Sequence, residues 1–489
     1  MSHPKLYEIR GAHFNHENRT TRFCLYAPNA RNVYLILIAY GIQQYRLQMT
    51  RNHEGLWEII TDQAPPGQSY LYLINDYHGK NKLRIDPISF SVVSNIITRQ
   101  VQSIVHDENV YMWADQNWMK QRVQRNPLKF PLSIYEIQPK SWKSSVYWPM
   151  NYRQITHELV NYCIEMGFTH VELYGILEHT DRWEYGYQVS NYFAPSRFNG
   201  RCDDLKYLID HLHQNNIGVI LDWVPTHFKH YHFFHGYSTS LHEYDGTDLY
   251  ASAASQWSTL YFDFDKEETR QLLRASALYF LDRLHFDGIR FDAVSQMIRR
   301  NQTDIPSAIA FLRELNYTIH THYPGVLCIA EETEGYPNVS RTMNFDLKWN
   351  FVWSNDARNF LHLNHLYIRY PQFWEYGEES YSLIYEYAEN LIIAYHRGIS
   401  NRHRIVVIHN FSNRGYTSYD IPLPRSDPNI ERIQHVTEVF NTNHSKYGGS
   451  DIFQNERIEF HHDHEQNIKL TVALPPLSTL ILDETLTSY

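Results

Sequence analysis

The sequence has few cysteines, no basic block and no long apolar run, and each shortage argues against a class of protein. Four cysteines occur in 489 residues, far apart and without the spacing of metal ligands, at positions 24, 163, 202 and 328. We expect reduced, mostly buried thiols in a cytoplasmic protein. No apolar stretch is long enough to cross a bilayer, and the N-terminus has no apolar segment typical of a secretory signal. We therefore expect no membrane association.

The charge balance argues against nucleic acid as a partner. The formal net charge is -10, and no run of Lys and Arg interrupts the sequence. A protein that neutralises phosphates needs a basic face. Aromatic residues make up 15% of the chain. Aromatic rings suit sugar faces but also fill large cores, so this number is only a weak indication of a carbohydrate ligand.

The length and the hydrophobic patterning predict three domains. A chain of 489 residues is too long for a single ordinary core. Residues 1–100 alternate short apolar runs with Pro and Gly turns, which is typical of a β-sandwich. Residues 101–379 alternate short strands with amphipathic helices, which is typical of βα units around a parallel sheet. Residues 380–489 return to alternating strands and predict a second all-β domain.

The middle segment contains six successive strand candidates: SIYEIQ, THVELYGI, VILDWVP, GIRFDAV, VLCIAEE and NFDLKWNF. Amphipathic helices separate them, and we expect the helix DDLKYLIDHLHQNNIG to end at Gly218. Six βα units indicate a TIM-type barrel, in which chemistry takes place at the carboxyl ends of the strands. The fold class is therefore α/β, an incomplete (β/α) barrel flanked by an N-terminal β-sandwich and a C-terminal all-β domain.

Three carboxylates fall at predicted strand ends: Asp222, Asp292 and Glu331. Arg290 lies two residues before Asp292, hence on the same face of its strand, and would keep Asp292 ionised and aimed. Glu331 could remain protonated in a less polar place. Two carboxyls with different roles are what glycoside chemistry requires. The alternative for each single residue is a structural role, as a helix cap or an ion-pair partner.

At these residues the chain resembles the α-amylase superfamily and, within it, the glycogen (1,4-α-glucan) branching enzymes. LDWVPTHF, DGIRFDAV and IAEE resemble three superfamily motifs, and LEHTDRWEYGYQVSNYFAPSRF, EYDGTDLY, FDLKWNF, FNTNHSKYGGS and LPPLSTLIL resemble branching enzymes. The resemblance implies that Asp292 is the nucleophile and Glu331 the general acid/base of a retaining reaction. It implies substrate-binding roles for Asp222, His227, Arg290 and for Tyr187, which would stack on the sugar at the cleavage subsite. The N-terminal sandwich resembles the family's carbohydrate-binding module.

The resemblance has one gap. Family members have a long segment after FDLKWN that carries the last two barrel strands and a fourth motif, a His-Asp pair whose Asp stabilises the transition state. Here WNFVWSNDARNFL runs directly into the last predicted helix. NDAR at 355–358 lies in a predicted helix and HHDH at 461–464 in a predicted β-domain loop, so neither replaces the pair. An incomplete barrel also leaves strand edges that must be covered.

The predicted function is that of a branching enzyme-like protein acting on α-1,4-glucan (glycogen, amylose or maltooligosaccharide), without metal or organic cofactor. The alternatives are a catalytically impaired or inactive glucan-binding or regulatory homologue, and an α-glucan hydrolase. The histidines of THFKHYHFFH at 227, 230, 232 and 235 match no structural metal site. Trp57, Tyr70 and Tyr72 could form a sugar platform, but core packing is the commoner fate of strand aromatics. The sequence leaves the oligomeric state open.

Overall fold

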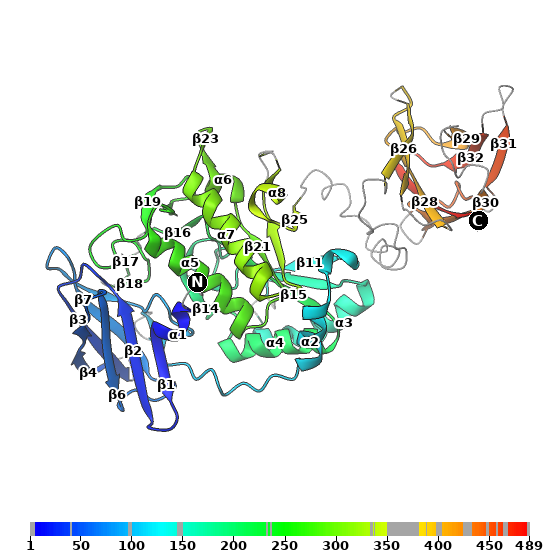
Figure 1. The fold of residues 1–489 in the computed structure, drawn as a ribbon. Helices are drawn as coiled ribbons and strands as arrows, with labels where there is room; N and C mark the ends of the chain where they lie inside the picture. The colour runs from blue at the N-terminus through cyan, green and yellow to red at the C-terminus, as the bar shows by residue number, and fades with distance from the viewer. Residues whose placement is uncertain are drawn as a thin grey trace. The chain divides into compact units, whose positions relative to one another are not determined.

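The computed structural model divides the chain into two compact units, residues 1–127 with 132–361 and residues 128–131 with 362–489 (Figure 1). It describes residues 5–39, 42–95, 100–143, 150–230, 233–234, 237–332, 336, 338–349, 381–387, 389–397, 403–423, 433–445, 449–455, 458–462 and 468–486. The predicted helix at 355–358 lies outside these residues, as does the predicted boundary at 380, which stays a prediction.

The first unit begins with a β-sandwich of two sheets whose strands within residues 11–104 pair antiparallel. One sheet has the order β1-β2-β6-β5; the other contains β3, β4, β7, β8, β9 and β10. Their bounds are β1 Gly11–Asn15, β2 Thr20–Tyr26, β3 Asn32–Ala39, β4 Ile42–Gln48, β5 Thr50–Arg51, β6 Leu56–Thr61, β7 Ser69–Asn75, β8 Asn81–Arg84, β9 Val92–Ser94 and β10 Val101–Ile104. Trp57, Tyr70 and Tyr72 are all buried in the core between the sheets. Core packing is confirmed for these three, so they form no sugar platform.

The second part of this unit is a parallel sheet of six strands in the described residues, in the order β11-β12-β15-β21-β24-β25. All five strand pairs are parallel. The strands are β11 Ile134–Ile137, β12 His170–Leu173, β15 Gly218–Trp223, β21 Gly288–Phe291, β24 Leu327–Ala330 and β25 Leu347–Lys348. This is the incomplete barrel expected from the sequence.

Four long helices connect successive strands of the sheet: α3 Tyr152–Met166, α4 Cys202–Gln214, α5 Glu267–Arg283 and α7 Pro306–His322. Asn151 and Gln154 form a capping box at the start of α3, and Gly167 ends that helix with a φ of 72°. The prediction that α4 ends at Gly218 is wrong. The helix ends at Gln214, a turn follows in which Asn216 has a φ of 60°, and Gly218 begins β15. Asn tolerates this left-handed conformation, so no glycine was needed there.

Short elements connect the sandwich and the sheet or extend their loops. Tyr244 donates a hydrogen bond to the Ile85 carbonyl at 2.8 Å, and β18 pairs with β8. The four free cysteines are buried, as expected. The remaining elements are α1 Leu6–Ile9, α2 Gln116–Gln124, the 3₁₀ turn Pro127–Lys129, β13 Leu177–His179, β14 Val189–Pro195, β16 His227–Lys229, β17 Phe233–Phe234, β18 Tyr237–Ser238, β19 Ala251–Ala254, β20 Thr259–Phe262, α6 Val294–Ile298, β22 Arg299–Arg300, β23 Thr303–Asp304 and α8 Val339–Met343.

The second unit is all-β, as expected. A five-stranded sheet has the order β26-β27-β28-β33-β30 and a three-stranded sheet the order β29-β32-β31. The strands are β26 Tyr381–Tyr387, β27 Ile392–Arg397, β28 His403–Asn410, β29 Tyr416–Pro422, β30 Ile433–Asn441, β31 Glu459–His462, β32 Ile468–Leu474 and β33 Ser478–Leu486. Residues 461–462 therefore end a strand rather than lying in a loop.

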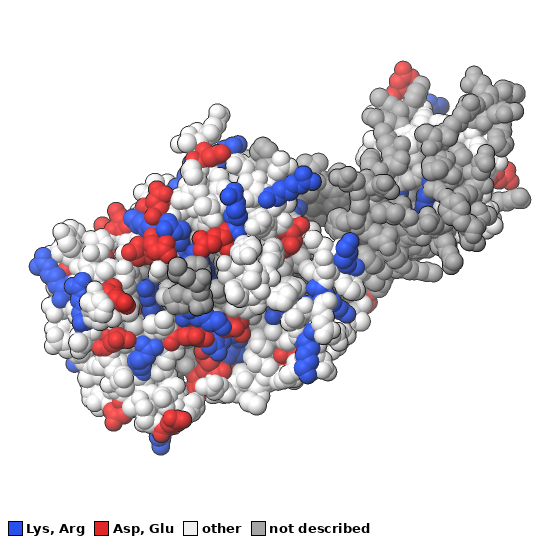
Figure 2. All heavy atoms as spheres, in the orientation of Figure 1, with Lys and Arg blue, Asp and Glu red and all other residues white. Residues whose placement is uncertain are grey.

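Two surface properties bear on the expected partners. No helix in the described part of the chain is long and apolar enough to cross a membrane. Figure 2 shows Lys and Arg intermingled with Asp and Glu over the visible face of the first unit. The expectation that the chain binds no nucleic acid stays a prediction.

Candidate functional site

The predicted carboxylates meet at one edge of the parallel sheet. Asp222 belongs to β15, while Asp292 and Glu331 directly follow β21 and β24. These strands are neighbours, and Asp222 lies in register with Arg290. Parallel neighbours end at the same edge, so residues far apart in the sequence converge there.

Arg290 is the centre of the cluster. Its Nη1 lies 2.6 Å from Asp222 Oδ1 and 2.7 Å from Asp292 Oδ1, and its Nη2 lies 3.0 Å from Glu331 Oε2. The guanidinium side chain is only 6% exposed. Charge-assisted bonds of this length in a dry place orient all three carboxyls. The structure thus brings together four of the residues that the sequence singled out.

The charges of the cluster are unbalanced, because one cation faces several carboxyls. Burial raises the pKa of Asp292 well above its ordinary value, although the Arg290 guanidinium opposes the rise. Burial also raises the pKa of Asp222. The surrounding carboxylates in turn hold the pKa of Arg290 well above its ordinary value despite its burial. The titration of these carboxyls is therefore coupled, and proton binding is a property of the whole cluster rather than of a single residue.

Glu331 lies in a more polar place than expected from the sequence. Besides its contact with Arg290, its Oε2 accepts the backbone N–H of Ala293 at 2.7 Å. Its side chain is 18% exposed. The expectation of a less polar spot is therefore wrong, because the residue after Asp292 aims its backbone donor at the carboxyl.

The backbone beside Asp292 is strained. Ala293 has a φ of 51° and a ψ of 42°, a left-handed conformation that costs a non-glycine residue about 1–3 kcal/mol. This turn is what directs the Ala293 N–H toward Glu331. Thr226 stabilises the turn, because its hydroxyl donates a hydrogen bond to the Asp292 carbonyl oxygen at 2.8 Å. The folded state thus contains a strained turn at Ala293, next to Asp292, which directs a backbone donor at the Glu331 carboxyl.

Tyr187 and His227 flank the cluster. Burial and the nearby Asp222 carboxylate raise the pKa of the Tyr187 hydroxyl well above its ordinary value, and the Tyr187 ring lies parallel to that of Tyr174, with centroids 6.3 Å apart. His227 is 3% exposed, and burial lowers its pKa to about 4. Its Nδ1 has no hydrogen-bond partner among the described residues, and its ring lies 4.8 Å from that of Trp257. The His227 side chain is thus neutral near pH 7.

Sequence reasoning missed Glu172. This residue of β12 is fully buried, and its Oε1 lies 3.9 Å from Arg290 Nε. Neither of its carboxyl oxygens has a hydrogen-bond partner in the described part of the chain. Burial raises its pKa well above the ordinary value, and Asp222 adds to the rise. The only signal in the sequence was an acidic residue inside the apolar strand THVELYGI.

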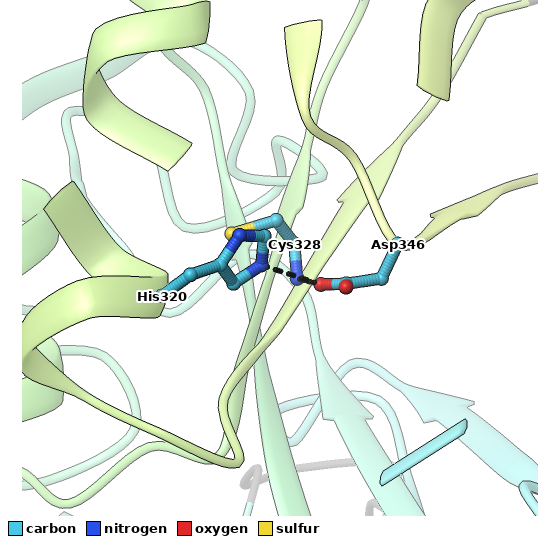
Figure 3. Close-up of side chains that lie close together, drawn as sticks. All are labelled: His320, Cys328 and Asp346. Carbon is cyan, nitrogen blue, oxygen red and sulfur yellow. Dashed lines mark hydrogen bonds and ion pairs between the residues drawn. The ribbon is translucent and has the colours of Figure 1, made fainter. Parts of the chain in front are cut away.

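Histidines outside the carboxylate cluster occur beside Cys328 and Asp346 and in the loop that follows β15. His320, Cys328 and Asp346 lie together between α7 and the sheet, with potential ligand atoms within 4.8 Å of one another (Figure 3). Asp346 Oδ2 already accepts the Cys328 backbone N–H at 2.7 Å and contacts His320 Nε2 at 2.9 Å, which explains the grouping by hydrogen bonding. In the histidine-rich loop, His232 and His235 lie outside the described residues.

Three protein-family models match the sequence. Residues 10–89 match carbohydrate-binding module 48 (isoamylase N-terminal domain). Residues 151–259 match the alpha amylase catalytic domain, and residues 385–484 match the alpha amylase C-terminal all-beta domain. The three matches fall on the sandwich, on the part of the parallel-sheet region that contains β12 and β15, and on the final β-unit, in that order.

Several relatives carry one name, 1,4-alpha-glucan branching enzyme GlgB. The protein from Rhodopirellula baltica is 34% identical over 422 residues, covering 80% of this chain and 56% of that protein. The one from Albidiferax ferrireducens is 34% identical over 419 residues, covering 80% of this chain and 65% of that protein. The one from Myxococcus xanthus is 35% identical over 425 residues. The chain thus spans only about half to two thirds of the length of these relatives.

Solved structures share the fold at low sequence identity. The pullulanase SAP of group B Streptococcus has a TM-score of 0.70 at 14% identity, covering 97% of this chain and 88% of that chain. The pullulanase from Bacillus acidopullulyticus has a TM-score of 0.69 at 16% identity, covering 97% of this chain and 74% of that chain.

Proposed function

The chain belongs to the α-amylase superfamily, and from this premise we propose that it is a 1,4-α-glucan branching enzyme-like protein acting on glycogen or a similar α-glucan. The observation that carries the proposal is the single guanidinium of Arg290 bonded to Asp222, Asp292 and Glu331. Retaining glycoside chemistry needs two carboxyls with different roles at one site. The edge of the sheet supplies them where barrel enzymes carry out chemistry.

In the first half of the reaction, an Asp292 carboxylate oxygen attacks the anomeric carbon of an α-1,4 linkage. The bond from that carbon to the leaving O4 breaks, and Glu331 gives its proton to O4. The product is a glucosyl ester on Asp292. Arg290 favours this step, because it stabilises the ionised form of Asp292 that attacks.

In the second half, Glu331 takes the proton of an acceptor 6-hydroxyl, whose oxygen displaces Asp292 and forms an α-1,6 linkage. Both contacts of Glu331, with Arg290 and with the Ala293 N–H, engage Oε2, so Oε1 is the oxygen that gives and takes the proton. Tyr187 supports the sugar ring at the cleavage subsite by stacking, while Asp222 and His227 bind its hydroxyls. Water in place of the 6-hydroxyl would give hydrolysis, the activity of an α-glucan hydrolase.

A second candidate is a glucan-binding homologue with impaired turnover. It is favoured by the gap after FDLKWN, because the sequence offers no His-Asp pair for the fourth motif. Loss of one preorganised group that stabilises developing charge typically costs about 10²–10³ in rate. Misplacement of donor and acceptor by about 1 Å can cost about 10²-fold more. On this candidate, the chain alone forms few branches.

An iodine-staining assay on amylose, followed by debranching, tests both candidates. New α-1,6 linkages at about 1–10³ s⁻¹ would support the branching enzyme and exclude the impaired homologue. Retention on glycogen or amylose without turnover would support the second candidate. New reducing ends without branches would identify a hydrolase, and failure to bind either glucan at low salt would contradict all three.

If turnover occurs, Asp292→Asn must abolish it, because an amide cannot form the glucosyl ester. The expected loss is several orders of magnitude, roughly 10⁴-fold or more. Asp304→Asn is a suitable control, since Asp304 is 43% exposed and pairs with Arg299 away from the cluster. An Asp292→Asn variant that keeps a tenth of the activity would show that another group is the nucleophile.

A further inference from the structure

Two large aromatic side chains stand in solvent on the loop that leads to Tyr187. Trp183 is 87% exposed and Tyr185 is 71% exposed. A large aromatic side chain stabilises the fold most when it is buried, so exposing one gives up that stabilisation. Neighbouring exposed aromatic side chains therefore indicate a ligand-binding surface more strongly than a single exposed one does. The protein's established resemblance assigns a role to Tyr187 and none to these two.

The loop that carries them is fastened to the barrel, so their exposure is not a consequence of a loose segment. Within the loop, the backbone N–H of Trp183 donates to Asp181 Oδ1 at 2.9 Å and closes a local turn. Gln138 Nε2 donates to the Tyr185 carbonyl at 2.9 Å. Lys140 donates to the carbonyl of the intervening Glu184. The backbone is therefore bonded to the segment that follows β11, while both side chains remain largely exposed.

A side-chain contact and a close backbone approach complete the fastening. Glu184 forms an ion pair with Lys229 of β16 at 3.2 Å. The backbone of Gly186 packs directly against that of Gly175. A Cβ at Gly186 would lie 2.3 Å from the Gly175 Cα, so only glycine allows this close approach. Gly186 also has a φ of 104°, which other residues rarely adopt. The rings are thus presented on a prearranged support.

A short stretch of chain connects the platform formed by Trp183 and Tyr185 to Tyr187 beside the carboxylate cluster. Tyr187 follows Tyr185 by two residues and lies near Asp222. Four residues of chain span at most about 14 Å, so the Trp183 backbone lies within that distance of the Tyr187 backbone. A polysaccharide that places one ring at Tyr187 therefore passes within reach of the platform.

We propose that Trp183 and Tyr185 form an additional binding site for an α-1,4-glucan chain, which extends the reaction site to substrates longer than those that Tyr187 alone can hold. This inference rests on the proposed function. Glucose rings are neutral and carry apolar C–H faces that stack on aromatic rings, while their hydroxyls bond to polar groups at the rim. Asp181 and Arg182 border the platform, and the Arg182 guanidinium lies 6.0 Å from the Trp183 ring. The platform selects chain length and takes no part in bond cleavage.

The test compares maltoheptaose with maltose by isothermal titration calorimetry of the full chain. Trp183→Ala and Tyr185→Ala should each weaken maltoheptaose binding by about 3- to 10-fold, the effect of losing one aromatic stacking contact. Maltose, which fits at Tyr187 without reaching the platform, should bind as before. Trp183→Phe should restore most of the affinity. Tyr317→Ala, at a 66% exposed tyrosine on α7, is the matched control and should change neither ligand.

The outcomes separate this inference from the proposed function. If the parent protein binds no maltooligosaccharide, the proposed function fails. If the parent binds maltoheptaose and both alanine variants bind it equally well, only the platform fails. A lower melting temperature in Trp183→Ala with unchanged glucan affinity would show that the ring packs against protein and would overturn the inference. Where turnover is measurable, the platform predicts a raised KM for amylose with an unchanged kcat.

Discussion

Replacing Arg290 by Gln tests the physical reasoning about the cluster without any need for turnover. The substitution removes the one cation bonded to Asp222, Asp292 and Glu331. Breaking a buried ion pair by removing one partner typically costs about 3–5 kcal/mol, because the remaining charges stay buried and unpaired. The cluster can reduce this cost only by taking up a proton.

Proton uptake makes the loss depend on pH with a defined sign. Burial already raises the pKa of Asp292 and of Glu172 well above their ordinary values, so the native cluster binds protons that the unfolded chain has released. Native-state protonation above that of the unfolded chain means that stability falls as pH rises. One additional proton in the Arg290→Gln variant steepens the fall by about 1.4 kcal/mol per pH unit. The penalty should therefore grow by about 2.8 kcal/mol between pH 5.5 and pH 7.5.

The assay is urea unfolding followed by tryptophan fluorescence at pH 5.5, 6.5 and 7.5, with parent and variant side by side. Arg274→Gln is the control: Arg274 is buried too and lies 2.8 Å from Glu314, but the Glu314 side chain is 46% exposed and solvated by water. Its penalty should not change over this range. An Arg290→Gln penalty that is equally constant would refute the account of shared protons.

Two further predictions concern single carboxyls. Glu172→Gln should raise the stability of the first unit at pH 7, because it removes the cost of a buried acid without hydrogen-bond partners in the described residues. The gain should shrink as the pH falls toward 4.5, because the raised pKa of Glu172 lets the native parent protein bind a proton there. The same urea titrations measure this gain, and destabilisation at pH 7 would contradict the prediction. Asp115→Asn should cost about 2 kcal/mol at pH 7, because hydrogen bonds from His213 and His285 lower the Asp115 pKa to about 2. The stabilisation by Asp115 is fully present above about pH 4 and is lost as the pH falls through 2, so the unfolding free energies of parent and variant should converge in acid. A difference that stays constant with pH would show that Asp115 acts by packing alone.

Local patterns were sufficient for the strands of the parallel sheet and for the presence of carboxylates at their ends. The alternation of apolar strands with amphipathic helices predicted six parallel strands, and six are present in the described residues. The spacing of Arg290 and Asp292 predicted a common face, because side chains on a strand alternate. Local patterns were not sufficient for the end of α4, since Asn216 could take the left-handed turn that was expected of a glycine.

The sequence by itself determined which residue types stand at strand ends, since strand periodicity and the position of Asp292 and Glu331 are local properties. Only the tertiary structure decided the surroundings of those groups. The polar setting of Glu331 depends on the strained turn at Ala293, and the burial of Glu172 depends on which strands are neighbours. The exposure of Trp183 depends on contacts from a segment more than forty residues away. Electrostatic environment and exposure are set by what packs around a side chain, and a linear sequence carries no record of that packing.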